Sequence, residues 1–229
     1  MKINEMFAPT IQGEGIHAGQ RVGFIRLANC NLSCSWCDTP YSWDWKRYDK
    51  TVEAKEMSVE EILAVIDTWD VDRIILTGGE PLMQQAELEE LASLAPQFDF
   101  DVETNGTIKP SDSLAVWIDM FNVSPKLTHS GDVQSKRIKP EALAKFKELA
   151  DDGQATFKFV VQHPEDLEEV NRWVDEFSIH KQGVWIMPEG AGTIEQITTL
   201  QRIGQSVVDA GYNLTTRLHV LVWDSERGV

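Results

Sequence analysis

Hydrophobic positions along this chain follow two alternating periods. Short runs rich in β-branched and aromatic residues predict strands, and stretches with apolar residues three or four positions apart predict helices between them. The predicted strands are 21–28, 73–78, 100–104, 115–123, 155–162, 183–189 and 214–223. The predicted helices are 58–69, 86–95, 139–153, 164–177 and 193–211. This alternation indicates β/α units around a parallel sheet, with functional residues after the carboxyl ends of the strands.

One predicted connection is too short for a regular β/α unit. Only residues 105–114 separate the strand that ends at Thr104 from the strand that begins near Ala115. A parallel crossover through a helix needs about a dozen residues or more. We therefore predict an α/β fold that is an incomplete, open β/α barrel with a reduced set of helices. No low-complexity tract, linker or repeat interrupts the chain, so we expect one domain over residues 1–229.

Composition and charge exclude several classes of protein. Hydrophobic residues make up 42% and charged residues 25% of the chain, which is typical of globular proteins. Asp and Glu total 37 against 21 Lys and Arg, a net charge of −16, which argues against direct binding to nucleic acid or to an anionic membrane. No apolar run approaches the roughly 18 residues of a membrane span, and the first residues lack the apolar segment of a secretion signal. We expect a cytoplasmic location.

All three cysteines lie within the eight residues "CNLSCSWC", from Cys30 to Cys37. An odd number in so short a segment cannot form a disulfide framework and fits a reducing compartment. A structural zinc site would need a fourth ligand, for which His17 and His129 are candidates. Three thiolates on a four-iron cluster would instead leave one iron without a protein ligand and free for chemistry. The spacing alone leaves both hypotheses open.

The cysteine spacing, C-x3-C-x2-C, resembles the signature of the radical S-adenosylmethionine (SAM) superfamily. Trp36 matches the aromatic residue that precedes the third cysteine, and "LTGGEP" (76–81) resembles the segment that binds the amino group of SAM. Glycines allow a backbone to approach a ligand closely, and the Glu80 carboxylate would complement an ammonium group. The resemblance implies a 4Fe–4S cluster held by Cys30, Cys34 and Cys37, with SAM beside it.

Further segments narrow the resemblance. "FAPTIQGEG" (7–15), "FIRLANCNLSCSWCDT" (24–39), "ETNGT" (103–107), "SPK" (124–126) and the terminal "RGV" (227–229) resemble the 7-carboxy-7-deazaguanine synthase family, and the likeness covers essentially the whole chain. That family converts 6-carboxy-5,6,7,8-tetrahydropterin to 7-carboxy-7-deazaguanine, on the route to queuosine and related 7-deazapurines. The resemblance implies a lyase that uses the iron–sulfur cluster, SAM and Mg²⁺, forms a homodimer and takes electrons from a flavodoxin-type donor.

The resemblance also assigns roles to individual residues. It makes Glu14 and Arg26 the catalytic residues, with Arg26 meeting the substrate carboxylate in a fork geometry that lysine could not reproduce. Thr39 would contact Mg²⁺. The pterin would lie against Ile11, Gln12, Gly13, Glu14, Arg26, Thr77, His219 and the carboxylate of Val229. SAM would lie against Trp36, Cys37, Asp38, Gly79, Ser124, Pro125, Lys126, Met187, Pro188, Glu189 and Gly190.

Simpler interpretations exist for several of these residues. Arg26 could form a surface ion pair, Thr77 could satisfy backbone at a strand end, and His219 could be a hydrogen-bonded core residue. The last residues could be a frayed tail instead of reaching the pocket from the carboxyl end of strand 214–223. For the protein as a whole, an activase that generates a glycyl radical would share the cysteines and "GGE" without needing "QGEG" or Arg26. A zinc-bound scaffold would be colourless and indifferent to SAM.

Overall fold

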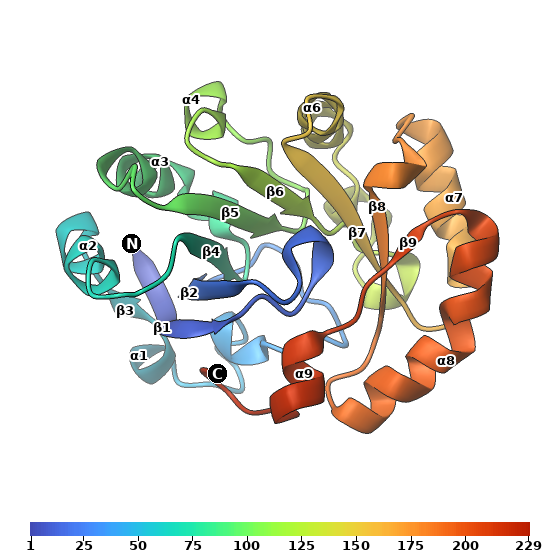
Figure 1. Cartoon of the computed structure of the whole chain (residues 1–229), viewed down its shortest axis with the longest axis horizontal. Coiled ribbons are helices and arrows are strands. Elements are labelled where there is room, and N and C mark those ends of the chain that lie inside the picture. Colours follow the sequence, from blue (N-terminus) through green and yellow to red (C-terminus); the bar gives the residue numbers. More distant parts are fainter.

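The strands form one curved sheet that does not close on itself (Figure 1). The computed structural model describes residues 1–229. The strand order is β3-β1-β2-β4-β5-β6-β7-β8-β9, so β3 and β9 are free edges and the predicted open barrel is confirmed. The strands are β1 (Lys2–Ile11), β2 (Arg21–Leu27), β3 (Lys55–Glu56), β4 (Arg73–Gly78), β5 (Asp99–Thr104), β6 (Met120–Val123), β7 (Ala155–Val161), β8 (Val184–Pro188) and β9 (Asn213–Leu214).

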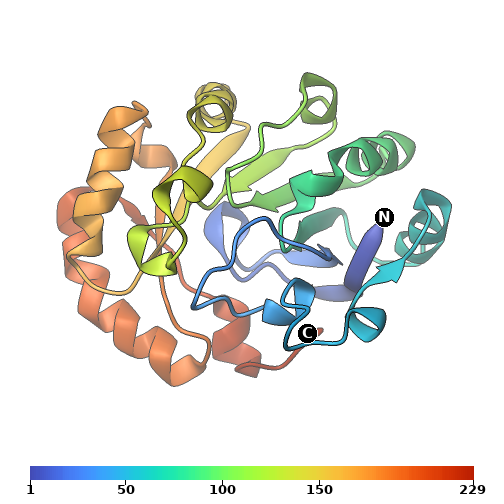
Figure 2. The ribbon, with the colours of Figure 1, turned by 180° about the vertical axis from the view of Figure 1, so that it is seen from behind.

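Most of the helices lie around the outside of the curved sheet, whereas α9 lies at its open side, between β1 and α8 (Figures 1 and 2). They are α1 (Lys50–Glu53), α2 (Val59–Ile66), α3 (Gln85–Leu94), α4 (Asp112–Ala115), α5 (Gln134–Arg137), α6 (Pro140–Asp151), α7 (Asp166–Glu176), α8 (Thr193–Ala210) and α9 (Leu218–Trp223). Short 3₁₀ turns are η1 (Gly15–His17), η2 (Pro40–Ser42), η3 (Pro81–Gln84), η4 (Thr128–Ser130) and η5 (Lys181–Gly183). The Ser58–Glu61 capping box predicted for α2 is present. No helix combines the length and the apolar character that a membrane span requires.

Strand β1 is an element that the hydrophobic pattern did not reveal. It contains Pro9 and several polar residues, and it is held by antiparallel pairing with β2 on one side and β3 on the other. The prediction that segment 21–28 is the first strand is therefore wrong. From β2 onward every neighbouring pair in the sheet is parallel, as expected.

The two faces of the sheet differ in polarity because side chains alternate along each strand. Residues that point outward, such as Phe100, Val102 and Phe121, belong to a core of 39 buried residues between sheet and helices. Their inward neighbours include Arg26 and Thr77, which are register partners. Glu103 and Asn122, Asn122 and Thr156, and Lys158 and Trp185 are partners farther along the sheet. The concave face thus carries a belt of polar side chains.

Two sequence predictions of strands need correction. Residues 112–115 form the single turn α4, and strand β6 begins only at Met120, so this crossover is indeed short of a full helix. The predicted strand 214–223 is wrong, because β9 ends at Leu214 and residues 218–223 are helix α9. The Leu218 N–H donates to the Gly13 carbonyl at 2.8 Å, which draws the chain away from the sheet and toward the β1–β2 turn.

Candidate active site

A cavity of about 330 Å³ opens on the concave side, where the parallel strands end. Its size is within the range of small-molecule sites. It brings together residues predicted from both ends of the chain, and two of the predicted residues, Gly13 and Pro125, do not line it. The predicted residues that line it are Ile11, Gln12, Glu14, Arg26, Cys30, Cys34, Trp36, Cys37, Asp38, Thr39, Thr77, Gly79, Ser124, Lys126, Met187, Pro188, Glu189, Gly190, His219 and Val229.

The segment from Cys30 to Cys37, here called the thiol loop, follows β2 and is held by its backbone. The Ser33 N–H donates to Asp132 at 2.8 Å, and the Ser35 N–H donates to the Ser130 carbonyl at 2.9 Å. These contacts attach the loop to the segment around η4, so that all three cysteines face the cavity.

The three thiols are free and receive only weak donors. The Leu32 N–H points to Cys30 Sγ at 3.4 Å, and the Trp43 indole N–H points to Cys37 Sγ at 3.2 Å. Burial raises the pKa of Cys30 to about 12 and also raises that of Cys34. The protein alone therefore does not stabilise these groups as thiolates, and a bound metal centre would.

The glycines of "LTGGEP" allow two pieces of backbone to meet. A Cβ on Gly78 would lie 2.1 Å from the Leu27 carbonyl oxygen, and one on Gly79 would lie 2.0 Å from that of Asn29. Gly78 also has φ +140°, which disfavours any other residue. The end of β4 consequently packs against the start of the thiol loop, and Gly79 reaches the cavity.

Glu80 does not have the role that the sequence suggested. Its side chain is fully buried and does not line the cavity. Its two oxygens accept hydrogen bonds from the Thr104 hydroxyl at 2.8 Å and the Asn105 N–H at 2.7 Å. The expectation that this carboxylate faces an ammonium group is wrong, because Glu80 instead holds the turn after β5.

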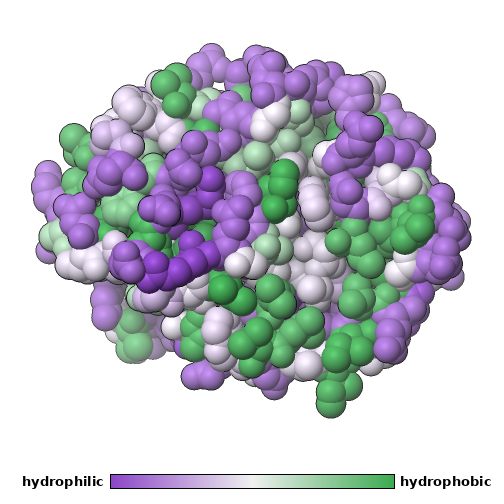
Figure 3. Space-filling model, viewed as in Figure 1, coloured by the Kyte–Doolittle hydropathy of each residue, from purple (hydrophilic) through white to green (hydrophobic).

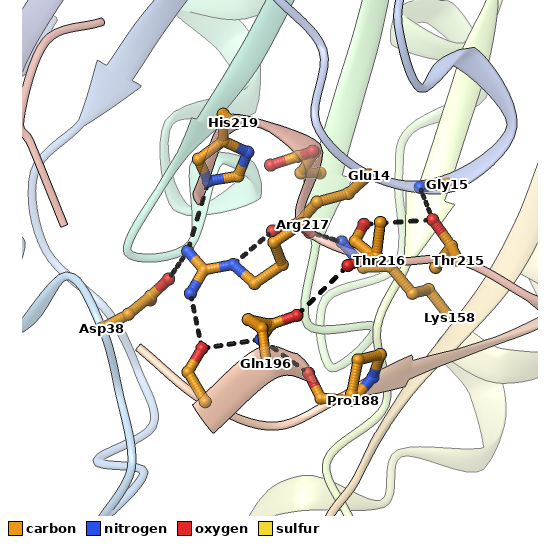
Figure 4. A network of polar contacts seen from close by, with 12 residues as sticks. Glu14, Gly15, Asp38, Lys158, Pro188, Gln196, Thr215, Thr216, Arg217 and His219 are labelled. Carbon is orange, nitrogen blue, oxygen red and sulfur yellow. Dashed lines mark hydrogen bonds and ion pairs between the residues drawn. The ribbon is translucent and has the colours of Figure 1, made fainter. Parts of the chain in front are cut away.

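Four charged side chains beside the β1–β2 turn form what we call the ion-pair network: Glu14, Lys158, Arg217 and Asp38 (Figure 4). Glu14 Oε1 accepts from Arg217 Nε at 3.0 Å, and Oε2 pairs with Lys158 Nζ. Burial by itself would raise the pKa of Glu14, but Lys158 and Arg217 outweigh it and lower that pKa well below its ordinary value. Glu14 is therefore ionised at neutral pH and can only accept hydrogen bonds.

A second carboxylate, Glu103, lies in the same cavity. Gln12 Nε2 donates to its Oε1 at 3.1 Å, and the Thr77 hydroxyl donates to its Oε2 at 2.8 Å. Gln12 and Thr77, both predicted to contact substrate, thus hold Glu103 in place.

Arg26 is attached to the end of the chain through one carboxylate. Its Nε donates to Glu5 at 2.7 Å, and Arg227 approaches the other oxygen of Glu5 at 3.3 Å. Arg227 also pairs with Glu53 at 2.6 Å, and its guanidinium lies 3.6 Å from the centre of the Tyr41 ring. Arg227 therefore anchors the tail, although residues 224–228 are exposed, and residues 224–229 border the cavity even though the strand predicted to carry them is absent.

The residues predicted to bind SAM form two groups. In the first, Lys126 Nζ donates to the Ser124 hydroxyl at 2.8 Å and lies 5.6 Å from the Trp36 ring centre. In the second, residues 187–190, which end β8 and begin the loop after it, are held by the buried side chain of Gln196. Its amide donates to the Pro188 carbonyl at 2.9 Å and to the Gly190 carbonyl at 2.7 Å.

Gly13 and His219 are close neighbours. A Cβ on Gly13 would lie 1.8 Å from His219 Nδ1, so the glycine makes room for the imidazole instead of lining the cavity itself. Burial lowers the pKa of His219 and the positive charge of Arg217 lowers it further. The negative charge of Glu14 acts in the opposite direction but does not outweigh them. The imidazole is therefore neutral at pH 7 and can both donate and accept a hydrogen bond.

The histidines considered as zinc ligands are engaged elsewhere. His17 Nδ1 contacts Asp101 at 2.6 Å, and His129 Nε2 contacts the Val160 carbonyl at 3.1 Å. Pro125 lies toward Gly106 instead of the cavity.

Sequence reasoning missed Lys158, Arg217 and Glu103. A lysine in the otherwise apolar run "ATFKFVV" was a usable signal, because a buried cation needs a partner. Alternation in "DFDVET" likewise places Glu103 on the face of Asp101, opposite the core residues Phe100 and Val102. Arg217 had no such signal, because it lies in a segment whose pattern suggested a strand.

Comparison with known proteins places this site in a known class. Residues 24–174 match the radical SAM superfamily, so the chain belongs to it. It is 38% identical to the 7-carboxy-7-deazaguanine synthase of Pyrobaculum aerophilum, over all of this chain and 97% of that protein. It is 33% identical to the synthase of Halobacterium salinarum, over 98% and 91% of the two chains. Within the superfamily, the chain belongs to the 7-carboxy-7-deazaguanine synthase family.

The fold agrees with solved structures. QueE from Escherichia coli superposes with a TM-score of 0.70 at 24% identity, covering 95% of this chain and 94% of that one. Streptococcus suis SuiB bound to S-adenosylmethionine superposes with a TM-score of 0.55 at 15% identity, over 82% of this chain and 48% of that one. At these identities the likeness supports the fold.

The residues present fit a 4Fe–4S cluster and SAM, the cofactors of this superfamily. Three free thiols face one cavity with N–H donors directed at two of the sulfurs, a common environment for iron–sulfur ligands. No three acidic, histidine or cysteine side chains are close enough to hold a single metal ion. In a four-iron cluster each thiolate binds a different iron, so the thiols need not converge on one point. The indole N–H of Trp36 is buried without a partner beside them.

Proposed function

We propose that this protein converts 6-carboxy-5,6,7,8-tetrahydropterin to 7-carboxy-7-deazaguanine with loss of ammonia. Family membership supports the reaction. The observation that carries it in this chain is the cavity itself, which places two ordered carboxylates and a half-buried arginine in the same space as three free thiols. Few ligands other than a polar heterocycle with both N–H donors and a carboxylate would match these groups.

The substrate would be held by charge and hydrogen bonding. Its amino and ring N–H groups need acceptors, and Glu14 and Glu103 are acceptors whose orientation is fixed by protein donors. Arg26 would meet the substrate carboxylate, with Glu5 holding the guanidinium from behind. Ile11, Thr77 and neutral His219 would complete the contacts, and the carboxylate of Val229 would accept from a further N–H.

The cofactor residues would lie on the opposite part of the cavity. Cys30, Cys34 and Cys37 would hold the cluster, while Trp36, Asp38, Gly79, the 124–126 segment and the 187–190 loop would border SAM. When bound, the cluster and SAM supply the electron and the 5′-deoxyadenosyl radical that begins the reaction. The task of the chain is to align substrate with that radical and to exclude water.

Three further proposals concern metal and partners. Thr39, which lines the cavity 3.7 Å from Cys37 Sγ, would contact Mg²⁺ together with substrate oxygens and water. The electron would come from a flavodoxin-type donor in the cytoplasm. The protein would be a homodimer. Apolar residues gather over the region of α8 and α9 on the face shown in Figure 3. The exposed apolar side chains of these two helices include Ile194, Ile197 and Val222, and such a surface suits contact with a second copy.

The direct test is turnover. Reconstituted protein would be incubated anaerobically with SAM, dithionite and the carboxy-tetrahydropterin, and the products identified by mass. We expect 7-carboxy-7-deazaguanine and ammonia. Because this conversion is redox-neutral, the abstracted hydrogen is returned, so 5′-deoxyadenosine and methionine should appear only from uncoupled cleavage of SAM, in smaller amounts than the deazaguanine. The Cys30→Ala variant should form none of these. Formation of 5′-deoxyadenosine without any change in the pterin would reject this substrate, and a colourless protein indifferent to SAM would reject the enzyme class.

A further inference from the structure

Arg217 contacts three separate parts of the cavity wall, and stabilising the Glu14 carboxylate accounts for only one of these contacts. We propose that it is a positioning residue that links the binding of SAM to the binding of the pterin. This inference rests on the proposed function, because it takes Glu14 as a substrate contact and Asp38 and Gly190 as neighbours of SAM.

The guanidinium of Arg217 joins three segments that are distant in sequence (Figure 4). Its Nε donates to Glu14, in the turn between β1 and β2, at 3.0 Å. Its Nη2 pairs with Asp38, the residue after the third cysteine. Its Nη1 donates to the carbonyl of Gly190, in the loop after β8, at 3.3 Å. One rigid, planar group therefore spans both proposed ligand sites.

The contacts of Arg217 with Gly190 and Glu14 are well defined, whereas the side chain of Asp38 is more exposed, at 38%. The Gly190 carbonyl also accepts from the buried amide of Gln196 at 2.7 Å, which fixes its direction. The side chain of Arg217 is 12% exposed and that of Glu14 is 13% exposed, so solvent screens their pairing weakly. Lys158, the other partner of Glu14, makes no contact with Asp38 or Gly190, so it stabilises the carboxylate without joining the two sites.

This arrangement has a thermodynamic consequence. A ligand that orders Asp38 and the Gly190 loop also orders the Arg217 guanidinium, and the guanidinium orders the Glu14 carboxylate that accepts from the pterin. The second ligand then binds to a site that is already arranged, and by linkage the effect is the same in either order of binding. Lysine at position 217 would keep the positive charge but could not make three directed contacts at once.

Dissociation constants test the inference without turnover. Cluster-loaded protein, without reductant, would be titrated calorimetrically with the carboxy-tetrahydropterin in the absence and in the presence of saturating SAM. We expect SAM to tighten pterin binding by about fivefold or more in the unaltered protein. In Arg217→Lys this factor should fall to near one, while each ligand alone still binds. The exposed Arg202→Lys, the same change outside the site, should keep the unaltered factor.

A second variant guards against misfolding of the first. Asp38→Asn removes the carboxylate that pairs with Arg217, so it should also reduce the factor by which SAM tightens pterin binding. Circular dichroism should confirm that each variant is folded. The double variant should lose no more coupling than Arg217→Lys alone, since both changes break one bridge. An unaltered protein in which SAM does not affect pterin affinity, or variants that keep the full factor, would overturn the inference. Absence of any pterin binding by the unaltered protein would instead reject the proposed function.

Discussion

The thiol loop and the ion-pair network lie in one cavity but balance charge differently. The sulfurs of the thiol loop have only weak N–H and hydroxyl contacts of 3.2 Å or more, and no salt bridge. In the network, Glu14 and Asp38 each have a cationic partner within the protein. Charge on the thiolates must therefore be balanced by what they bind, whereas the charges of the carboxylates are already balanced by cations of the protein. The two regions should respond to substitution in different ways.

The largest expected effect is loss of a thiol. Cys30→Ala, Cys34→Ala or Cys37→Ala should abolish the visible absorbance of the cluster and all cleavage of SAM, because each thiolate holds its own iron. Fold and thermal stability of the protein without cluster should change little, since the thiols carry no ion pair. A single variant that keeps full turnover would remove the radical interpretation altogether.

Glu14→Gln should act on stability as well as activity. It leaves the buried Lys158 without its carboxylate partner and Arg217 with Asp38 alone, which costs about 3–5 kcal/mol of unfolding free energy. Exposed Glu141→Gln is the matched control and should cost almost nothing.

The same variant gives a pH test with a definite sign. The pKa of Glu14 is lowered from 4.5 in the folded protein, so its contribution is fully present above about pH 4.5 and is lost as the pH falls through the folded value. Denaturant unfolding at a series of pH values should show a constant difference between the unaltered protein and Glu14→Gln from pH 8 to pH 5. A difference that disappeared near neutral pH would contradict the assigned ion pairs.

The C-terminal tail allows a smaller but distinct effect. Residues added after Val229 should raise KM about tenfold or abolish turnover while leaving the cluster intact, because they displace a segment held by Arg227 beside Arg26. A tag at the N-terminus should be tolerated. Met1 donates to the Met57 carbonyl at 2.6 Å, and an amide N–H would keep that donor. Equal activity of both tagged forms would show that the C-terminal tail has no role in substrate binding or turnover.

The smallest effect is expected at Thr39. Thr39→Ala should keep the cluster and SAM binding but weaken the dependence of turnover on Mg²⁺, and Thr39→Ser should restore it because the hydroxyl is retained. Initial rates across a Mg²⁺ titration measure this. An unchanged dependence on Mg²⁺ in Thr39→Ala would show that the hydroxyl only stabilises the loop and does not contact the metal ion.

The thiol loop and the ion-pair network also differ in how far sequence alone predicts them. The thiol loop is local, and the spacing of Cys30, Cys34 and Cys37 is visible in eight residues. The open barrel was predictable for the same kind of reason, since strand alternation and the short 105–114 connection are local features. The network joins Glu14 to Arg217 across 203 positions, and no local pattern reports such a contact.

The failures have specific physical causes. Strand β1 was missed because pairing with β2 and β3 outweighs the weak propensity of a run that contains Pro9. Residues 218–223 alternate like a strand, yet the contacts of Arg217 and Leu218 with the β1–β2 turn hold them in a helix instead. In both cases tertiary contacts decided a local conformation.

The central claim is that the thiol side of the cavity activates SAM while the Glu14 side holds the pterin. The most direct measurement is the ratio of 5′-deoxyadenosine to 7-carboxy-7-deazaguanine formed anaerobically with dithionite, SAM and the carboxy-tetrahydropterin by the unaltered protein, Cys34→Ala and folded Glu14→Gln. We predict deazaguanine in excess of 5′-deoxyadenosine from the unaltered protein, because a redox-neutral reaction returns the abstracted hydrogen. We predict neither compound from Cys34→Ala, and 5′-deoxyadenosine with little or no deazaguanine from Glu14→Gln. Deazaguanine formed by Glu14→Gln at the unaltered rate would contradict the assignment of the two sides.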